Sequence, residues 1–152
     1  MEPSGTRTLL VLCEGNICRS PMAAAMLQEG LGARFRVVSA GLGARDGFPA
    51  HPQAARLMAA RALDLSGHAS RQLTPELALG ADLILVMDRA QKELCEHMLP
   101  SVKGRVFLLG QWRRPVPLEV PDPYQRGPEV FREVLDAIDL CVADWIPRLA
   151  AR

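Results

Sequence analysis

Cys13 and Arg19, six positions apart near the start of the sequence, are the residues best suited to chemistry. A cysteine thiolate is a strong nucleophile, and the planar guanidinium of arginine can bind two oxygens of one phosphate group. Ser20 follows directly, and its hydroxyl could donate a hydrogen bond to the thiolate both before attack and when the thiolate leaves again. This spacing predicts a phosphoryl-transfer site with Cys13 as the nucleophile.

The segment that joins these residues predicts an anion-binding loop. Gly15 and Asn16 tolerate left-handed backbone angles, which turn successive N–H groups toward one point. A helix predicted to begin near Ser20, with Ser20 as its N-cap and Pro21 at the first helical position, adds the positive end of its dipole. This field favours the thiolate form of Cys13 and binding of a phosphate. The residues expected to contact the phosphate are Glu14, Gly15, Asn16, Ile17, Cys18 and Ser20.

Short apolar runs predict the strands that position this loop. They lie at 9–12, 37–39, 82–87 and 106–109, and helical patterns at 20–31, 52–63, 89–98 and from 128 onward alternate with them. This order predicts an α/β fold, a three-layer sandwich with a central four-stranded parallel sheet flanked by helices. Ligands of such sheets bind beyond the carboxyl ends of the strands, where the loop after Cys13 begins.

The bulk properties predict one domain, 1–152, in the cytoplasm. The chain has 152 residues, 49% of them hydrophobic, which is enough for one buried core. Its net charge of +1 favours neither nucleic acid nor an anionic membrane. We find no export signal near the N-terminus and no apolar run of the roughly 18 residues that a membrane span needs, so we expect no membrane insertion. The four cysteines are then expected to be mostly reduced.

Three sequence motifs carry a resemblance to a known family. The letters CEGNICRSP at 13–21 resemble the signature loop of the low-molecular-weight protein tyrosine phosphatases, and SAG at 39–41 and DPY at 122–124 match that family in order and approximate position. SAGLGA at 39–44 and GHASRQ at 67–72 are most similar to the bacterial members associated with exopolysaccharide or capsule export. The resemblance covers nearly the whole chain and implies a metal-independent and cofactor-independent tyrosine phosphatase.

The resemblance implies that Asp122, in the long proline-rich loop 111–127, is the general acid and later the general base. Such a group accelerates a reaction by about 10²–10⁴-fold. The alternative for Asp122 is that it only initiates a turn before Pro123. Tyr124, the single tyrosine of the chain, is implied as one wall of the slot for the substrate ring. Leu42 is implied as the opposite wall, with ordinary packing as the alternative.

The resemblance also implies supporting roles. Asn16, Ser39 and His68 are expected to hold the phosphate loop by hydrogen bonds, although for His68 alone a capping or core role is the alternative. Cys18 is expected to form a reversible disulfide with Cys13 under oxidants, or else to be a small buried residue. Glu14 departs from many relatives, which carry a small or apolar residue there. We interpret its carboxylate as selecting substrates with basic residues near the phosphotyrosine.

Two alternative functions share part of this pattern. A thioredoxin-coupled arsenate reductase shares the Cys-x5-Arg loop but needs two further cysteines close together near the third strand, whereas Cys95 and Cys141 are far apart in the sequence. A non-catalytic phosphate-binding module would not need Cys13, Ser20 and Asp122 together. No metal-ligand spacing is present. The resemblance implies a phosphotyrosine protein as partner, a bacterial tyrosine autokinase, and we expect a monomer or weak dimer.

Overall fold

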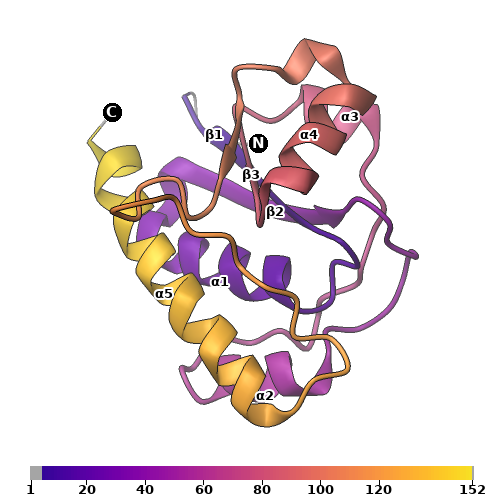
Figure 1. The fold of residues 1–152 in the computed structure, drawn as a ribbon, viewed down its shortest axis with the longest axis vertical. Helices are drawn as coiled ribbons and strands as arrows, with labels where there is room; N and C mark the ends of the chain where they lie inside the picture. The colour runs from indigo at the N-terminus through magenta and orange to yellow at the C-terminus, as the bar shows by residue number, and fades with distance from the viewer. Residues whose placement is uncertain (1–4, 152) are drawn as a thin grey trace.

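The computed structural model describes residues 5–151 and contains a parallel sheet covered by helices on both sides (Figure 1). The start of the N-terminal stretch in which we found no export signal lies outside these residues. In chain order the strands are β1 (Arg7–Cys13), β2 (Phe35–Gly41), β3 (Leu83–Val86) and β4 (Val106–Leu108). The helices are α1 (Arg19–Leu31), α2 (Pro52–Ala59), α3 (Pro75–Leu79), α4 (Arg89–Met98) and α5 (Pro128–Ala150), with short 3-10 turns at Gly32–Arg34 and Pro100–Val102.

Within residues 5–151, the sheet has four strands in the order β2-β1-β3-β4, and every pairing is parallel. The first strand is therefore central, and its carboxyl end at Cys13 is flanked by the ends of β2 and β3. A right-handed crossover through a helix is the usual way to connect such strands. The predicted fold class is confirmed, and the four predicted strand segments all fall on the observed strands.

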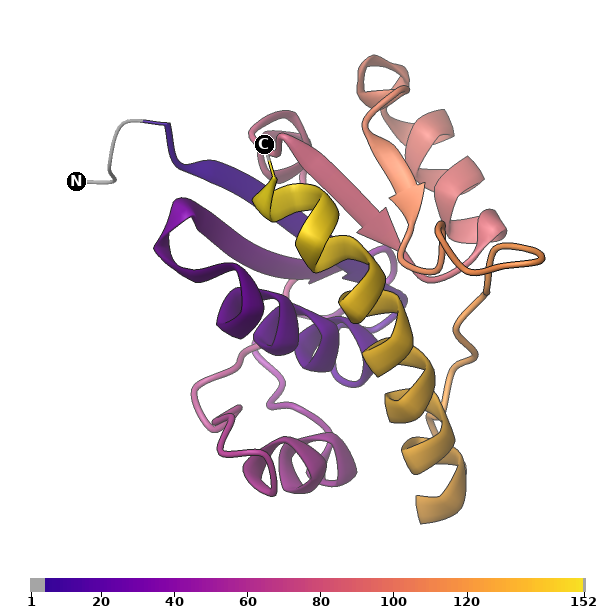
Figure 2. The same ribbon diagram turned by 90° about the vertical axis from the view of Figure 1, so that its left-hand side faces the viewer.

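The side chains of β1 alternate between two apolar clusters, one on each face of the sheet. Leu9 and Val11 pack with α1, α2 and α5, whereas Leu10 and Leu12 pack with α3, α4 and the 3-10 turn at Pro100–Val102. In Figure 2, α1 and α5 lie side by side on one side of the sheet while α4 lies on the other. This two-sided burial explains why the strand is a continuous apolar run without polar alternation.

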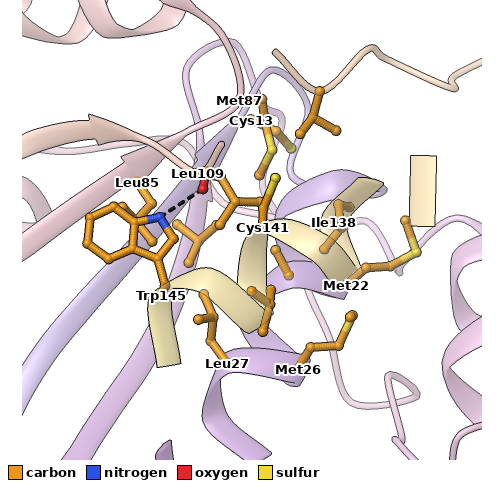
Figure 3. Close-up of a cluster of buried hydrophobic side chains, with 14 of the residues drawn as sticks. Cys13, Met22, Met26, Leu27, Leu85, Met87, Leu109, Ile138, Cys141 and Trp145 are labelled. Carbon is orange, nitrogen blue, oxygen red and sulfur yellow. Dashed lines mark hydrogen bonds between the residues drawn. The ribbon is translucent and has the colours of Figure 1, made fainter. Parts of the chain in front are cut away.

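Helix α5 packs closely against the carboxyl ends of the central strands (Figure 3). The indole Nε1 of Trp145 donates a hydrogen bond of 2.8 Å to the carbonyl of Leu109, just after β4. Cys13, Met87 and Cys141 belong to the same buried cluster. The side chain of Cys13, the last residue of β1, is thus packed in the buried core beside α5.

Two local predictions were wrong, and one helix was missed. The first helix begins at Arg19 with Cys18 in the N-cap position and no side-chain capping bond, so Ser20 is not the N-cap. The helix predicted over 52–63 ends at Ala59, because Ala62 adopts a left-handed conformation (φ 60°) in a tight turn. Helix α3, five residues capped by Thr74, was not predicted, since it is too short to show a periodic pattern. Among the described residues, no helix is long and apolar enough to cross a membrane.

Candidate active site

Cys13 is the last residue of β1, and the chain then turns through a loop that ends where α1 begins. The turn uses a left-handed residue at Asn16 (φ 58°), as predicted, whereas Gly15 has no positive φ. Gly41 at the end of β2 allows the loop to lie close by, because a Cβ there would be 2.6 Å from the carbonyl oxygen of Glu14. The loop is therefore positioned by the ends of two neighbouring strands.

The sulfur of Cys13 has two hydrogen-bonding contacts. The backbone N–H of Asn16 donates to Sγ at 3.3 Å, and the Ser20 hydroxyl oxygen lies 2.9 Å from Sγ. The side-chain amide of Asn16 donates to the same Ser20 oxygen at 2.8 Å, which leaves the Ser20 hydrogen available to the sulfur. Both contacts stabilise negative charge on Cys13.

Asn16 is fully buried and connects the loop to two other segments. Its amide donates to Ser39 Oγ at 2.9 Å, and its side-chain oxygen accepts from the backbone N–H of Arg71 at 3.0 Å. His68 Nε2 donates to the Asn16 carbonyl at 2.7 Å. The structure thus brings Asn16, Ser39 and His68 together, in the arrangement expected of residues that hold the loop.

Arg19 and Asp122 approach each other from segments about a hundred positions apart. Arg19 is 4% exposed, and one of its guanidinium nitrogens donates to the Val120 carbonyl at 2.9 Å. Another lies 3.6 Å from Asp122 Oδ2. The other Asp122 oxygen accepts from the backbone N–H of Tyr124 at 3.0 Å, so the carboxylate also forms the turn that we considered as its alternative role. About half of the Asp122 side chain is exposed, and it is free to reach a ligand.

A cleft of about 510 Å³ opens above the loop. The predicted residues Tyr124, Asp122 and Arg19 line it together with Cys13. The other lining residues are Glu14, Gly15, Ile17, Cys18, Gly43, Ala44, Arg45, Phe48, Pro49, Ala50, Pro52 and Ser70. Most of this surface is apolar, and the charged groups are gathered at the loop and the rim.

Leu42 does not line the cleft, so its expected role as a slot wall is wrong. It is 7% exposed and packs in the apolar cluster on the α3 and α4 face of the sheet. Leu42 continues the pairing of β2 with β1, because its N–H donates to the Cys13 carbonyl at 2.9 Å. The chain leaves the sheet only after this residue, and the next residues, from Gly43 onward, reach the cleft.

Cys18 and Cys13 differ in their surroundings. Burial, followed by the charges of Cys13 and Asp122, raises the pKa of the Cys18 thiol to about 12, although the charge of Arg19 acts in the opposite direction. Cys18 is therefore a neutral thiol at physiological pH. The remaining two, Cys95 and Cys141, are fully buried in the clusters on opposite faces of the sheet. They cannot pass a disulfide to each other as an arsenate reductase would require.

Several residues of the site were not predicted from the sequence. His51 caps α2 through its ring nitrogen, which accepts from the Gln53 N–H at 3.1 Å, and its backbone N–H donates to the Ile17 carbonyl of the loop. The His51 ring also contacts Tyr124 edge-on, with centroids 6.2 Å apart. A polar residue directly before Pro52 was the available signal for this cap. Phe48 and Ser70 gave no such signal, because nothing local indicates that they face the cleft.

No group of three or more histidine, cysteine or acidic side chains within residues 5–151 is placed to hold a metal ion. The site consists instead of a thiol, a buried arginine and an exposed carboxylate around one loop at the carboxyl end of a parallel sheet. This combination defines an α/β protein with a cysteine-containing phosphate loop.

The comparisons with known proteins agree with this class. Residues 8–152 match the model of the low molecular weight phosphotyrosine protein phosphatase family, and the chain belongs to that family. It is 45% identical over 145 residues to the probable low molecular weight protein-tyrosine-phosphatase EpsP of Ralstonia nicotianae, an alignment that covers 95% of this chain and 97% of the relative. It is 41% identical to Wzb of Escherichia coli K12, covering 94% and 95% of the two chains.

Solved structures show the same similarity. Vibrio vulnificus Wzb in complex with benzylphosphonate has a TM-score of 0.89 and 34% identity to this chain, covering 95% of this chain and 99% of the other. The YwlE arginine phosphatase of Geobacillus stearothermophilus also has a TM-score of 0.89, at 29% identity, covering 95% and 94%. The fold is thus shared by Wzb, which is named as a tyrosine phosphatase, and by YwlE, which is named as an arginine phosphatase.

Proposed function

We propose that this chain, as one domain over 1–152, hydrolyses phosphotyrosine in proteins through a covalent phosphocysteine at Cys13. The observation that carries the proposal is that Cys13, Arg19 and Asp122 line one cleft, with the Cys13 sulfur hydrogen-bonded to Ser20. No metal or cofactor takes part in the proposed reaction.

In the first step, the Cys13 sulfur attacks phosphorus, and the bond from phosphorus to the phenolic oxygen breaks. Asp122 donates its proton to that oxygen, so tyrosine leaves as the neutral phenol. Arg19 and the loop N–H groups stabilise the charge on the transferring phosphoryl group. The bond between Arg19 and the Val120 carbonyl holds the guanidinium in place beforehand.

In the second step, water attacks the phosphocysteine and the bond from sulfur to phosphorus breaks. Asp122, now a carboxylate, accepts a proton from that water, and inorganic phosphate is released. The Ser20 hydroxyl donates to the departing thiolate, which makes it a better leaving group. Cys13 is regenerated as a thiolate and Asp122 as the acid.

Phosphotyrosine is the substrate that the cleft favours over phosphoarginine. The lining beyond the loop is formed largely by apolar side chains, among them Ile17, Phe48, Pro49 and Tyr124, which suit an aryl ring better than a guanidinium that needs polar partners. The motif resemblance supports a bacterial tyrosine autokinase governing exopolysaccharide synthesis and export as the physiological partner. On this proposal the enzyme acts in the cytoplasm as a monomer or weak dimer.

The test is hydrolysis of p-nitrophenyl phosphate, a phosphotyrosine peptide and a phosphoarginine peptide with chelator present. Cys13→Ser is expected to abolish turnover. Asp122→Ala is expected to lower turnover of the phosphotyrosine peptide by about 10²–10⁴-fold, the contribution of a general acid. Asp64→Ala is the matched control, since Asp64 likewise accepts a backbone N–H two residues later, from Ser66, but lies outside the cleft.

A reduced, folded wild-type protein without turnover would overturn the enzyme proposal in favour of a phosphate-binding module. Faster turnover of the phosphoarginine peptide would overturn the choice of substrate. An Asp64→Ala variant as impaired as Asp122→Ala would show that loss of a turn, rather than of an acid, causes the effect.

A further inference from the structure

Glu119 lies shortly before the proposed acid, Asp122, in the proline-rich loop, and its carboxylate binds another element. Its Oε2 accepts a hydrogen bond of 2.8 Å from the backbone N–H of Arg89, the first residue of α4. An N–H in the first turn of a helix has no partner within the helix, and negative charge is favourable there. The sequence of this turn contains no acidic residue, and the N-cap residue Asp88 accepts from the Gln91 N–H instead. Glu119 therefore supplies the acceptor from outside the helix.

The next residue, Val120, is bound to the same junction between β3 and α4. Its N–H donates to the Met87 carbonyl at 2.9 Å, and its carbonyl accepts from the Arg19 guanidinium at 2.9 Å. Val120 is 1% exposed and belongs to the buried cluster on the α5 face of the sheet. This residue fixes one point of the loop, but the chain could still turn about that point. The bond from Glu119 to Arg89 is a second attachment, which fixes the direction in which the chain continues.

Two prolines pass this direction on to Asp122. Pro121 and Pro123 flank Asp122, and the ring of each fixes its own φ and disfavours the helical conformation for the residue before it. Neither proline has an N–H with which to bind the chain elsewhere. Few backbone torsions are therefore free between Val120 and Asp122, so the place of the Asp122 carboxyl group depends on how residues 119 and 120 are attached.

We propose that Glu119 is a positioning residue for Asp122. This inference rests on the proposed function, in which Asp122 protonates the leaving oxygen. By binding the start of α4, Glu119 holds the Asp122 carboxylate in the cleft that Cys13 also lines, with one oxygen 3.6 Å from a guanidinium nitrogen of Arg19. A general acid acts only within hydrogen-bond reach of the oxygen that it protonates, so a small displacement of the loop removes much of its effect.

The experiment compares kcat/KM for phenyl phosphate and for 2,4-dinitrophenyl phosphate. Phenol is a weak acid, so its oxygen needs a proton as it leaves, whereas dinitrophenolate leaves as the anion. Attack by Cys13 and binding by Arg19 contribute to both reactions, so the ratio of the two values reports the acid alone. Glu119→Ala is expected to lower kcat/KM for phenyl phosphate by about 3- to 10-fold, a part of the contribution of a general acid, and to leave the dinitrophenyl ester unchanged.

Two further variants are the controls. Glu119→Gln keeps an acceptor oxygen for the Arg89 N–H and is expected to restore most of the lost rate with phenyl phosphate. Thr74→Ala removes a side chain that accepts the Leu77 N–H at the start of α3, at 3.2 Å, but lies outside the cleft. It should leave the ratio unchanged. A Glu119→Gln variant as slow as Glu119→Ala would overturn the role of the accepted hydrogen bond.

A double variant tests whether Glu119 acts through Asp122. If it does, Glu119→Ala adds no further loss with phenyl phosphate to a protein that already carries Asp122→Ala. Additive losses would overturn the positioning role of Glu119, because the effect would then not pass through the acid.

The remaining outcomes separate this inference from the proposed function. Unchanged kcat/KM for phenyl phosphate in Glu119→Ala would overturn the inference, and so would an equal loss for both esters, which indicates a general distortion of the site. If wild-type protein hydrolyses neither ester, or if Asp122→Ala leaves hydrolysis of phenyl phosphate intact, the proposed function itself fails.

Discussion

The chemistry of the site depends on the different surroundings of Cys13 and Cys18, two thiols near each other in the sequence. Cys13 receives the Asn16 N–H and the Ser20 hydroxyl, which both stabilise a thiolate. Burial instead keeps Cys18 protonated, with its pKa raised to about 12. Of the two cysteines in this loop, Cys13 is therefore the one whose surroundings suit a nucleophile.

This difference predicts the pattern of alkylation by iodoacetamide at pH 7.5. Cys13 should be labelled, and labelling should slow when inorganic phosphate occupies the loop. Cys18 should stay unmodified because an uncharged thiol is a poor nucleophile. Cys95 and Cys141 should stay unmodified because burial raises the pKa of both thiols and because, unlike Cys13, they do not line the cleft. Mass spectrometry of tryptic peptides measures this. Labelling of Cys18 as fast as that of Cys13 would contradict the assignment.

At the scale of elements, the docking of α5 places the end of the loop 111–127, which carries Asp122, because the helix begins directly after that loop. This helix packs along α1 and is joined to the end of β4 by the bond from Trp145 to the Leu109 carbonyl. A second indole, Trp112, contacts the Trp145 ring edge-on and stacks under Arg148. Its buried Nε1 has no hydrogen-bond partner among residues 5–151.

The two tryptophans form a matched pair for a stability measurement. Trp145→Phe leaves the buried Leu109 carbonyl without a donor and should lower the free energy of unfolding by about 1–3 kcal/mol in addition to the lost contact area. Trp112→Phe removes an N–H that already lacks a partner and should cost less. Urea denaturation of both variants measures the difference, and an equal loss would show that the Trp145 bond contributes nothing.

The sequence predicted what depends on local patterns. The strands and the anion loop follow from apolar runs and from residue types between Cys13 and Arg19, and the structure has them there. The positions of Leu42 and Phe48 could not be assigned in this way, because their backbone groups form hydrogen bonds with Gln72 and Ser70, which lie far along the chain. Ser20 was expected to cap α1, but bonds to Cys13 and Asn16 occupy its hydroxyl.

At the scale of the whole molecule, His51 links stability to pH. Burial, helped by the charge of Arg56, lowers the pKa of His51 from its ordinary value of 6.5. The unfolded chain then binds this proton at a higher pH than the folded chain does. The contribution to stability is therefore complete above pH 6.5 and is lost as the pH falls toward the lowered pKa.

We expect wild-type protein to lose more stability between pH 7.5 and 5.5 than the His51→Asn variant. Asparagine keeps an acceptor for the Gln53 N–H at the start of α2 but does not titrate. Urea midpoints at the two pH values measure the difference, and His68 and His97 cancel because both proteins contain them. Equal losses would show that His51 is not the titrating group.

The hydrogen bond from Arg19 to the Val120 carbonyl joins an early and a late segment of the chain at the site. Cys13 and Arg19 belong to the first part, whereas Val120 and Asp122 follow β4. Neither part holds both the proposed nucleophile, Cys13, and the proposed acid, Asp122. If the chain were divided at the exposed turn around Gly104 (φ +92°), each fragment alone would be inert, and recovered turnover would report that the fragments had reassembled.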